Sequence, residues 1–354
     1  MASRPEARTD QELGTKPLMA VLHGEVRDPP PLWMMRQAGR YLPEYRSLRA
    51  DKGGFLALVY DSDAAAEVTL QPLRRFAQLD AAILFSDILI VPFAMGQDLR
   101  FVAGEGPRLA PRLAQAAFEA LAAVPGRLAG IYETVAKVKA ALGLDKTLIG
   151  FAGSPWTVAT YMIAGQGSRE QAEARGFALR DPAAMQTLID AIVAMTIDYL
   201  CGQIDAGADT VQLFDSWSGS LSPREFERWV IAPTAAIVAA LHQARPGVPV
   251  IGFPKGAGGK LPAYARETGV DALGLDETVD PVWANRELPH GLPVQGNLDP
   301  LVLLHGSERL EAEVAAIRTA LAGRPHVFNL GHGIVKETPI ANVERFMAAV
   351  KGSR

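Results

Sequence analysis

The sequence predicts an α/β protein folded as a single (β/α)8 TIM barrel. Three observations support this: short apolar runs recur along the chain, helix-period segments separate them, and polar side chains follow each run. Runs that are continuously apolar, rather than alternating, are typical of strands buried on both faces, as in a parallel sheet. Such barrels have about 250 residues and grow with insertions, so a chain of 354 residues fits one barrel.

Eight apolar runs qualify as strands by their length and their content of Val, Ile, Leu and Phe. They cover residues 31–35, 81–85, 147–151, 209–214, 248–253, 271–275, 292–296 and 326–330. The main alternative is an open doubly wound sheet, which is weakened because no G-x-G-x-x-G sequence follows the first run. No linker divides the chain, so we expect residues 17–354 to form one domain. Residues 92–125, rich in Gly and Pro, are interpreted as an excursion within that domain.

Helix-period segments separate the apolar runs. Apolar stripes with steps of three and four residues occur in 185–199, 310–321 and 66–77. The four residues from Ser222 to Glu225 match a capping box with proline at the first helical position, which predicts a helix start. We expect Pro233 to kink or end that helix, because proline lacks the N–H that continues the ladder.

Composition excludes several classes of protein. Hydrophobic residues make up 49% and charged residues 21% of the chain, as in soluble globular proteins, and the net charge of −4 gives no basic field for nucleic acid or anionic membranes. The single cysteine excludes an intramolecular disulfide and a zinc site with two thiolates. Residues 1–16 have no signal-peptide core and are expected to be a disordered lead. No long apolar run predicts a membrane span, so we expect a cytoplasmic protein.

The side chains that follow the runs carry the functional prediction, because a (β/α)8 barrel performs its chemistry where its strands end. Arg36 and Arg40 follow the first run, with Ala38 and Gly39 between them. Guanidinium groups bind carboxylates in bidentate fashion, and small residues let backbone N–H groups approach an anion. The alternative, a helix start with two solvated arginines, stays open on residue types alone.

Asp87, Ser216 and His332 follow the second, fourth and eighth runs. Asp87 is either a cap for the next turn or a functional carboxylate. Ser216 lacks the G-x-S-x-G context of a nucleophile and is interpreted as a hydrogen-bonding or capping serine. His332 is interpreted as a hydrogen-bond donor or proton shuttle, since no partner at a metal-ligand offset accompanies it. The glycine-rich residues 255–259 fail the phosphate-loop order and are interpreted as a flexible turn.

Six segments of this chain resemble the uroporphyrinogen decarboxylase family, in the order seen in that family. They are PLWMMRQAGRYLPEYR, LQPLRRF, FSDIL, GFAGSPWTVATYM, QLFDSWSG and NLGHGI. The resemblance covers roughly residues 17 to 350. It implies a homodimeric barrel that works without metal or organic cofactor. It also implies removal of carboxyl groups from the four acetate side chains of uroporphyrinogen III, giving coproporphyrinogen III and CO2 in haem or chlorophyll biosynthesis.

The resemblance also assigns site residues. The implied catalytic residues are Asp87, Arg36, Tyr161 and His332. The implied substrate-binding residues are Arg36, Gln37, Ala38, Gly39, Arg40, Asp87, Phe151, Tyr161, Phe214, Ser216 and His332. Trp217 departs from the smaller side chain expected there, which concerns the rim of the site only.

Two alternatives to the decarboxylase stay open. One is a zinc-dependent corrinoid methyltransferase of a related barrel, disfavoured because the lone Cys201 lies in a helix-period segment. The other is a porphyrin-binding protein without catalytic activity.

Overall fold

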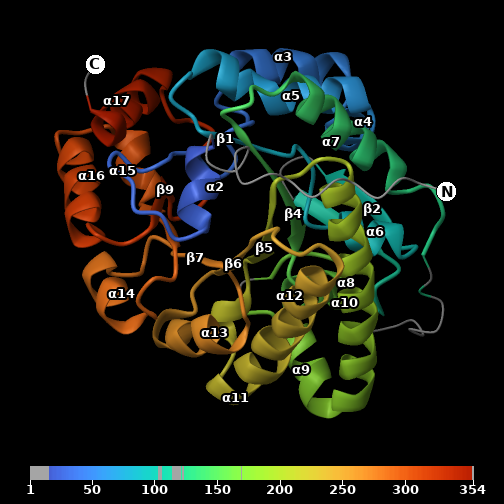
Figure 1. The fold of residues 1–354 in the computed structure, drawn as a ribbon. Helices are drawn as coiled ribbons and strands as arrows, with labels where there is room; N and C mark the ends of the chain where they lie inside the picture. The colour runs from blue at the N-terminus through green and yellow to red at the C-terminus, as the bar shows by residue number, and fades with distance from the viewer. Residues whose placement is uncertain (1–15, 103–105, 114–120, 122, 169, 353–354) are drawn as a thin grey trace.

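The strands form a ring surrounded by helices, as the computed structural model shows in Figure 1. The structure describes residues 16–102, 106–113, 121, 123–168 and 170–352. All but the last residue of the predicted lead, residues 1–16, therefore lies outside the described residues. The sequence prediction of a parallel α/β barrel is confirmed.

Seven parallel strands form the main sheet, in the order β1-β4-β5-β6-β7-β8-β9. Their bounds are β1 Ala81–Ile83, β4 Thr147–Gly153, β5 Thr210–Asp215, β6 Val250–Pro254, β7 Ala272–Gly274, β8 Val294–Leu298 and β9 His326–Leu330. Each of the last seven predicted runs contains or overlaps one of these strands. Their burial is nearly complete, which agrees with the continuous apolar pattern that predicted them.

The first apolar run, residues 31–35, closes the ring between β9 and β1 without forming a full strand. Leu32 makes one parallel bridge to Phe328 of β9, and the Phe328 N–H donates to the Pro31 carbonyl at 2.8 Å. On the other side the Asp80 N–H donates to the Leu32 carbonyl at 2.8 Å. The run therefore lies where the prediction placed it, between two strands of the ring. The predicted length of the strand is wrong, because Pro31 has no N–H to donate to a longer ladder.

Side chains of the same segment anchor it inside the ring. The indole N–H of Trp33, a fully buried residue, donates to Gln295 Oε1 at 2.8 Å. The Gln295 amide donates in turn to Gln212 Oε1 at 3.1 Å. A buried hydrogen-bond chain therefore crosses the barrel interior and fixes the segment that leads to Arg36.

Helices cover the outside of the ring (Figure 1). Their bounds are α2 Pro17–Leu22, α3 Pro43–Asp51, α4 Phe55–Tyr60, α5 Ser62–Arg75, α6 Ile90–Ala94, α7 Ala129–Ala141, α8 Pro155–Ala164, α9 Ala172–Arg180, α10 Pro182–Asp205, α11 Pro223–Phe226, α12 Ala232–Ala244, α13 Leu261–Glu267, α14 Pro281–Glu287, α15 Pro300–His305, α16 Arg309–Ala320 and α17 Ile340–Lys351. The three predicted apolar stripes lie in α5, α10 and α16, which confirms them as helices.

The region around Pro233 differs from the prediction. A helix does begin after Ser222, but the serine side chain makes no capping bond, and Glu225 accepts instead from the Trp229 indole at 2.6 Å. A π-helical turn at Glu227–Ile231 precedes α12, and Pro233 lies in the first turn of α12. We expected Pro233 to kink or end the helix, and the predicted end is wrong, because the helix continues as α12. The π-helical turn places Pro233 in the first turn of α12, where the backbone needs no N–H donor.

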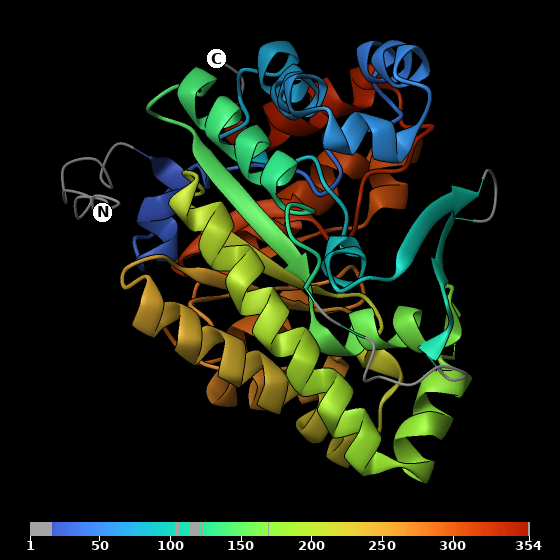
Figure 2. The same cartoon turned by 90° about the vertical axis from the view of Figure 1, so that its right-hand side faces the viewer.

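The excursion at residues 92–125 contains an antiparallel hairpin that sequence analysis did not predict. Its strands are β2 Asp98–Val102 and β3 Gly106–Ala110. Figure 2 shows the hairpin projecting at the side of the barrel toward which the β4 arrow points, with α2 at the opposite side. The hairpin therefore lies at the end of the ring where the strands finish.

Helix α10 is the one helix in the described part of the chain that is long and apolar enough to cross a membrane. Its 24 residues have a mean hydropathy of 1.3 over the most apolar window, and 44% of that window is buried inside the protein. Contacts with α8, α12 and β4 cover its apolar stripe. The apolar side chains of α10 thus pack against the ring and the neighbouring helices.

Candidate active site

Four predicted side chains lie within electrostatic reach of one another where the strands end. These residues, Arg36, Asp87, Tyr161 and His332, are called the strand-end cluster below. The positive charge of Arg36 acts on the pKa of each of the other three residues. The cluster joins residues that are up to 296 positions apart because the closing segment, β1, β4 and β9 all finish at the same end of the ring.

Arg36 has a backbone conformation that glycines around it make possible. Its φ of 62° lies in the left-handed region that residues with a side chain rarely adopt. A Cβ at Gly333 would lie 2.8 Å from Arg36 Nε, and a Cβ at Gly39 would lie 2.7 Å from the Arg36 carbonyl oxygen. Ala38, which lies between Arg36 and Gly39 in this turn, is half-buried. Strained residues of this kind concentrate at functional sites, and only glycine leaves room for this one.

Gln37 and Arg40, both predicted to bind substrate, lie outside the strand-end cluster. The fully buried Gln37 side chain accepts from the Met34 N–H at 3.1 Å and donates to the Ala81 carbonyl at 2.9 Å. It therefore ties the turn to β1. Arg40 is exposed, and its charge acts on Tyr45, whose pKa is raised by burial against the effect of nearby cations.

Of the two interpretations of Asp87, the structure confirms the cap, and the role as a functional carboxylate stays a prediction. Its Oδ1 accepts the Leu89 N–H at 2.8 Å, just before α6 begins at Ile90, so it caps the turn. Burial raises the pKa of Asp87 to about 6, although the Leu89 N–H and the charge of Arg36 both work to lower it. The carboxyl is thus a half-buried acid in the field of an arginine.

Aromatic side chains line the ring next to the cluster. Phe151 of β4 and Phe214 of β5 stack edge to face with ring centroids 5.5 Å apart. Phe214 makes a second edge-to-face contact with Phe253 of β6 at 5.9 Å. The positive edges of aromatic rings meet the faces of their neighbours in this arrangement, which gives a rigid apolar wall. Both predicted lining residues therefore belong to one wall.

Tyr161 and Ser216 come to the site from neighbouring strand ends. Tyr161 lies on α8, directly after β4, and burial raises the pKa of its hydroxyl. Its ring centroid lies 6.4 Å from that of Trp217. Ser216 is half-buried in the turn after β5. The unexpected Trp217 thus contacts a predicted site residue and shapes the edge of the site.

The surroundings of His332 favour its neutral form. Burial lowers the pKa of its imidazole to about 4, and the charges of Arg36 and Lys255 act in the same direction, while Asp276 opposes them. A group with so low a pKa holds no transferable proton of its own near neutrality. Of the two predicted roles, hydrogen-bond donor and proton shuttle, the lowered pKa favours the donor.

Asp215 is a buried acid next to the site that sequence analysis did not single out. Its Oδ1 accepts from the Thr157 hydroxyl at 2.6 Å, and Thr157 Oγ1 accepts the Trp217 N–H at 3.1 Å. Burial raises the pKa of Asp215 to about 7. The acid ends a buried run immediately before Ser216, and that position was the signal that could have identified it.

The turn after β6 was predicted to be flexible, and this is wrong. The Lys255 N–H donates to the Asp215 carbonyl at 3.0 Å, and the Gly256 N–H donates to Asp276 Oδ2 at 2.7 Å. Gly256 has a φ of 73°, so glycine serves a sharp bend. The glycines therefore give this turn a fixed shape, and they hold Lys255 beside the cluster.

The described residues contain no group of three or more His, Cys, Asp or Glu side chains placed to hold a metal ion. Cys201 lies half-buried on α10, outside the ring of strands. The thiol that a zinc-dependent methyltransferase would need is therefore away from the strand ends.

Comparisons with known proteins show the family of the chain. The family model for uroporphyrinogen decarboxylase matches residues 13–353. A uroporphyrinogen decarboxylase of Rhizorhabdus wittichii is 71% identical over 96% of this chain and 98% of the relative, and one of Novosphingobium aromaticivorans is 67% identical over 95% and 98%.

A solved structure described as a methyltransferase from Methanosarcina mazei superimposes with a TM-score of 0.78. It covers 94% of this chain and 96% of that chain, at 18% sequence identity. So low an identity shows a shared fold only. Together with the family match, these findings establish that the chain belongs to the uroporphyrinogen decarboxylase family.

Proposed function

We propose that this chain decarboxylates uroporphyrinogen III in haem biosynthesis. It removes the carboxyl groups of the four acetate side chains, giving coproporphyrinogen III and four CO2. The observation that carries the proposal is the half-buried carboxyl of Asp87 in the field of Arg36, in a chain of the decarboxylase family.

Loss of CO2 from an acetate side chain needs an acceptor for the electron pair of the broken C–C bond. A pyrrole ring protonated on carbon is such an acceptor, because its iminium-like cation takes the pair as CO2 departs. A proton then adds to the exocyclic carbon to give a methyl, and the ring carbon releases the proton that it had accepted, which restores the pyrrole. The site must therefore stabilise a ring cation and hold the carboxylates of the macrocycle.

Asp87 meets the first requirement. With a pKa of about 6, the carboxyl is about nine-tenths ionised at pH 7. Burial destabilises the ionised carboxylate of Asp87, because it removes water from the charge. A cation that forms on the macrocycle stabilises the carboxylate in place of that water. Preorganised charge of this kind stabilises the transition state more than the ground state, by about 3–4 kcal/mol for one group.

The arginines meet the second requirement. Arg36 and Arg40 bind acetate and propionate carboxylates, while Tyr161, Ser216 and His332 orient further carboxylates or the macrocycle itself. Two candidates remain for the proton donor, Arg36 and a bound water. A guanidinium is a poor acid, because its pKa lies above about 12.

We also infer that residues 17–354 act as one catalytic domain and that the protein works as a cytoplasmic homodimer. Strands from across the chain share one ring, which supports a single domain. The single cysteine suits a reducing compartment. Light scattering after size exclusion should give twice the chain mass of 37.9 kDa, and a single-chain mass would contradict the dimer.

Anaerobic incubation with uroporphyrinogen III tests the activity. The protein is treated with a chelator beforehand, and products are separated by carboxyl number. The proposal expects loss of four carboxyl groups per macrocycle with release of CO2. Binding of the macrocycle without release of CO2 would support a non-catalytic porphyrin-binding protein instead.

A further inference from the structure

We propose that Lys255 is a further substrate-positioning residue, which binds a peripheral carboxylate of the macrocycle on the side of the barrel opposite Arg36. The inference rests on the proposed function, since it concerns how that site holds its substrate. Nothing in the sequence motifs assigned this role to Lys255, which was interpreted as part of a flexible turn.

The first argument is position in the ring. The sheet order places the closing segment beside β1, followed by β4, β5 and β6, while β9 returns to the closing segment. Counted around the eight positions, β6 lies diametrically opposite the segment that carries Arg36. Lys255 follows directly after β6, so its ammonium and the Arg36 guanidinium start from opposite walls.

The second argument is rigidity. The Lys255 N–H donates to the Asp215 carbonyl at 3.0 Å, and the Lys255 carbonyl accepts from the Ser218 hydroxyl at 3.0 Å. Both partners belong to the turn that also carries Ser216. The backbone of Lys255 is therefore fixed relative to a predicted substrate-binding residue, and only its side chain is free to move.

The third argument is that the ammonium is only loosely held. Its one ion-pair partner in the described part of the chain is Glu277, with Nζ 3.4 Å from Oε1. Charge-assisted bonds between these groups are usually about 2.7–2.9 Å long. The lysine side chain is 28% exposed, and an ammonium has three N–H donors, so a substrate carboxylate can replace or join Glu277.

The fourth argument is convergence on His332. The charges of both Lys255 and Arg36 act on this imidazole, with Asp276 acting against them. Two cations from opposite walls thus flank one cluster residue. A macrocycle with carboxylates around its edge matches this arrangement better than an anion with a single charged end, because opposed cations can hold opposite sides of it.

Kinetics of Lys255→Gln with uroporphyrinogen III test the role. We expect KM to rise about tenfold, the loss of one charged hydrogen bond, with kcat changed less than threefold. Lys255→Arg should restore a KM within threefold of the unmodified protein. The control is Lys336→Gln, which removes an exposed lysine paired with Glu337 at 3.1 Å and should leave KM unchanged.

A KM increase below threefold in Lys255→Gln overturns the inference, provided that the unmodified protein decarboxylates the substrate. Failure of the unmodified protein to release CO2 would instead contradict the proposed function, so the two failures are distinguishable. An NMR titration of His332 gives a readout without substrate. Its pKa should rise in Lys255→Gln, and an unchanged pKa would contradict the placement of the ammonium beside the imidazole.

Discussion

The two ends of the barrel use aspartates in opposite ways. Where strands begin, Asp80, Asp209 and Asp271 each accept a backbone N–H from the neighbouring strand position and also contact a basic side chain. Where strands end, Asp87 and Asp215 accept one close bond each from a neutral donor, and neither forms an ion pair within the described residues.

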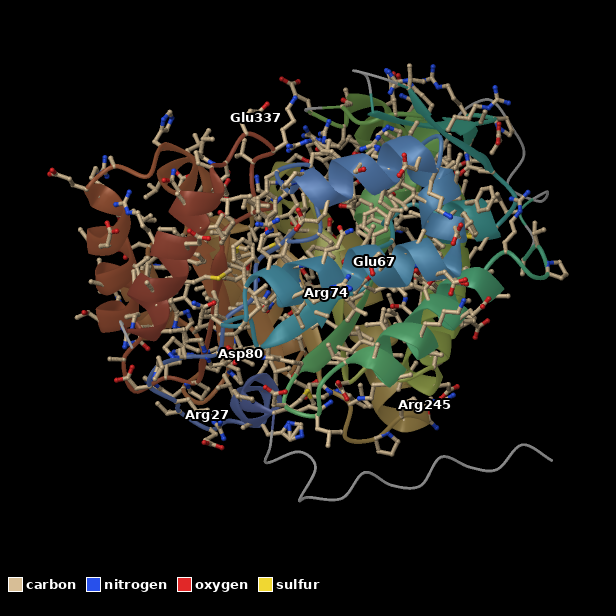
Figure 3. All side chains as sticks on the ribbon, turned by 90° about the horizontal axis from the view of Figure 1, so that it is seen from above. Arg27, Glu67, Arg74, Asp80, Arg245 and Glu337 are labelled. Carbon is tan, nitrogen blue, oxygen red and sulfur yellow. The ribbon has the colours of Figure 1, made fainter. Side chains whose placement is uncertain are left out.

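The three aspartates at the beginning repeat one device. Asp80 accepts from the Leu32 N–H at 2.7 Å, Asp209 from Leu148 at 2.9 Å and Asp271 from Val250 at 2.7 Å. They precede β1, β5 and β7, which are alternate positions in the ring. Their basic partners are Lys351, the pair Lys16 and Lys139, and His242. Figure 3 shows Asp80 at this end and Glu337 at the other.

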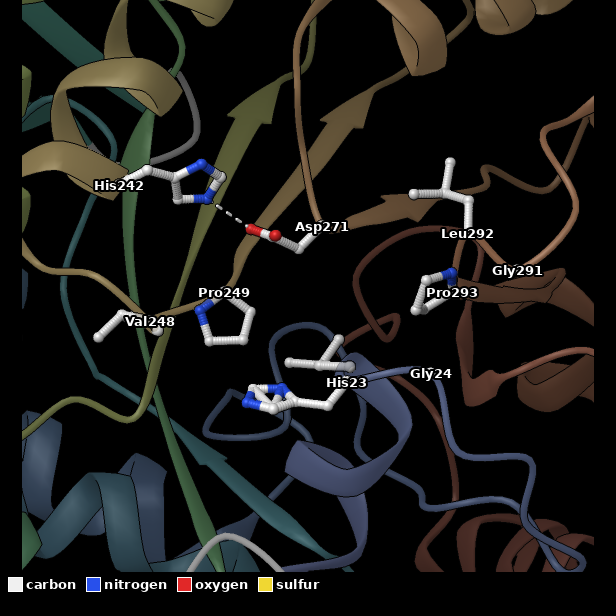
Figure 4. Close-up of a pocket in the computed structure, with 11 residues that line it drawn as sticks. His23, Gly24, His242, Val248, Pro249, Asp271, Gly291, Leu292 and Pro293 are labelled. Atoms are coloured by element: carbon white, nitrogen blue, oxygen red, sulfur yellow. Dashed lines mark hydrogen bonds and ion pairs between the residues drawn. The ribbon is translucent and has the colours of Figure 1, made fainter. Parts of the chain in front are cut away.

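One of these aspartates also lines a cavity. Its volume is about 670 Å³, and Asp271 and His242 face it together with His23 (Figure 4). The His242 to Asp271 contact of 2.9 Å lies within its wall. This cavity is at the opposite end of the ring from the strand-end cluster, so it is separate from the proposed active site.

The pKa directions show what the difference means. Burial works to raise the pKa of Asp209, but the Leu148 N–H and the two lysines hold it below its ordinary value. Burial prevails at Asp87, with a pKa of about 6, and at Asp215, with a pKa of about 7. Paired aspartates thus stabilise the beginning of the ring, while incompletely paired acids at its end remain available for chemistry.

The largest expected effect is on turnover. Asp87→Asn removes the charge that stabilises the ring cation and keeps the side-chain shape. We expect kcat to fall by a factor of about 100–1,000, the usual cost of losing one preorganised electrostatic group. Single-turnover assays with uroporphyrinogen III measure this, and a kcat within threefold of the unmodified protein would remove Asp87 from the mechanism.

The next effect is on stability, at the other end. Asp209→Asn removes the carboxylate, 4% exposed, that pairs with both Lys16 and Lys139. We expect the free energy of unfolding to fall by about 2–4 kcal/mol, because removing one partner of a buried ion pair leaves the other charge without compensation. Thermal unfolding at pH 7 measures it. The exposed Asp98, paired with Arg100, gives the matched control, and Asp98→Asn should change little.

Arginine substitutions should follow the geometry of the site. Arg36→Ala removes the cation that acts on Asp87, Tyr161 and His332. Both arginines are exposed, but only Arg36 acts on the other residues of the cluster, so we expect KM to rise about 30-fold for Arg36→Ala, against about fivefold for Arg40→Ala. Equal effects of the two substitutions would show that the strand-end cluster is not the centre of binding.

The smallest effect concerns how stability depends on pH. The folded-state pKa of Asp87 is raised from 3.8 to about 6, so its ionisation costs stability as pH rises between these values. The pKa of Asp209 is lowered, so its contribution is present above its ordinary pKa and is lost as pH falls below that. The rise in the pKa of Asp87 corresponds to at most about 3 kcal/mol, and the partial exposure of this residue reduces this. Asp87→Asn should therefore be more stable than the unmodified protein at pH 7, by about 1–2 kcal/mol, and nearly equal in stability near pH 4. Denaturant unfolding at both pH values checks this, and a destabilised variant at pH 7 would contradict it.

Apolar runs predicted the ring, because strands that are buried on both faces consist of consecutive apolar residues, and such runs can be read directly from the sequence. The same pattern could not show that Pro31 limits the closing segment to one bridge. The hairpin formed by β2 and β3 was missed because its strands are partly exposed and carry charged residues. Pro233 was misjudged because a π-helical turn depends on packing around the helix.

The site was predicted in part for a similar reason. Position after a strand was enough to bring Arg36, Asp87 and His332 together, since topology fixes where strands end. The sequence could not show that Arg36, and not Arg40, acts on Asp87 and His332, because the direction of each side chain depends on the left-handed backbone of Arg36. Glycines at 256 and 258 suggested mobility, while hydrogen bonds that fix the turn to Asp215 and Asp276 are invisible without the fold.

The central claim is best tested by turnover of Asp87→Asn and Asp209→Asn measured side by side at pH 7, below the unfolding temperature of both. The account predicts that Asp87→Asn loses at least about 99% of kcat while unfolding at or above the temperature of the unmodified protein. Asp209→Asn should unfold at a lower temperature and keep its kcat within threefold. Normal turnover by Asp87→Asn, or lost turnover in folded Asp209→Asn, would contradict the division between the two ends.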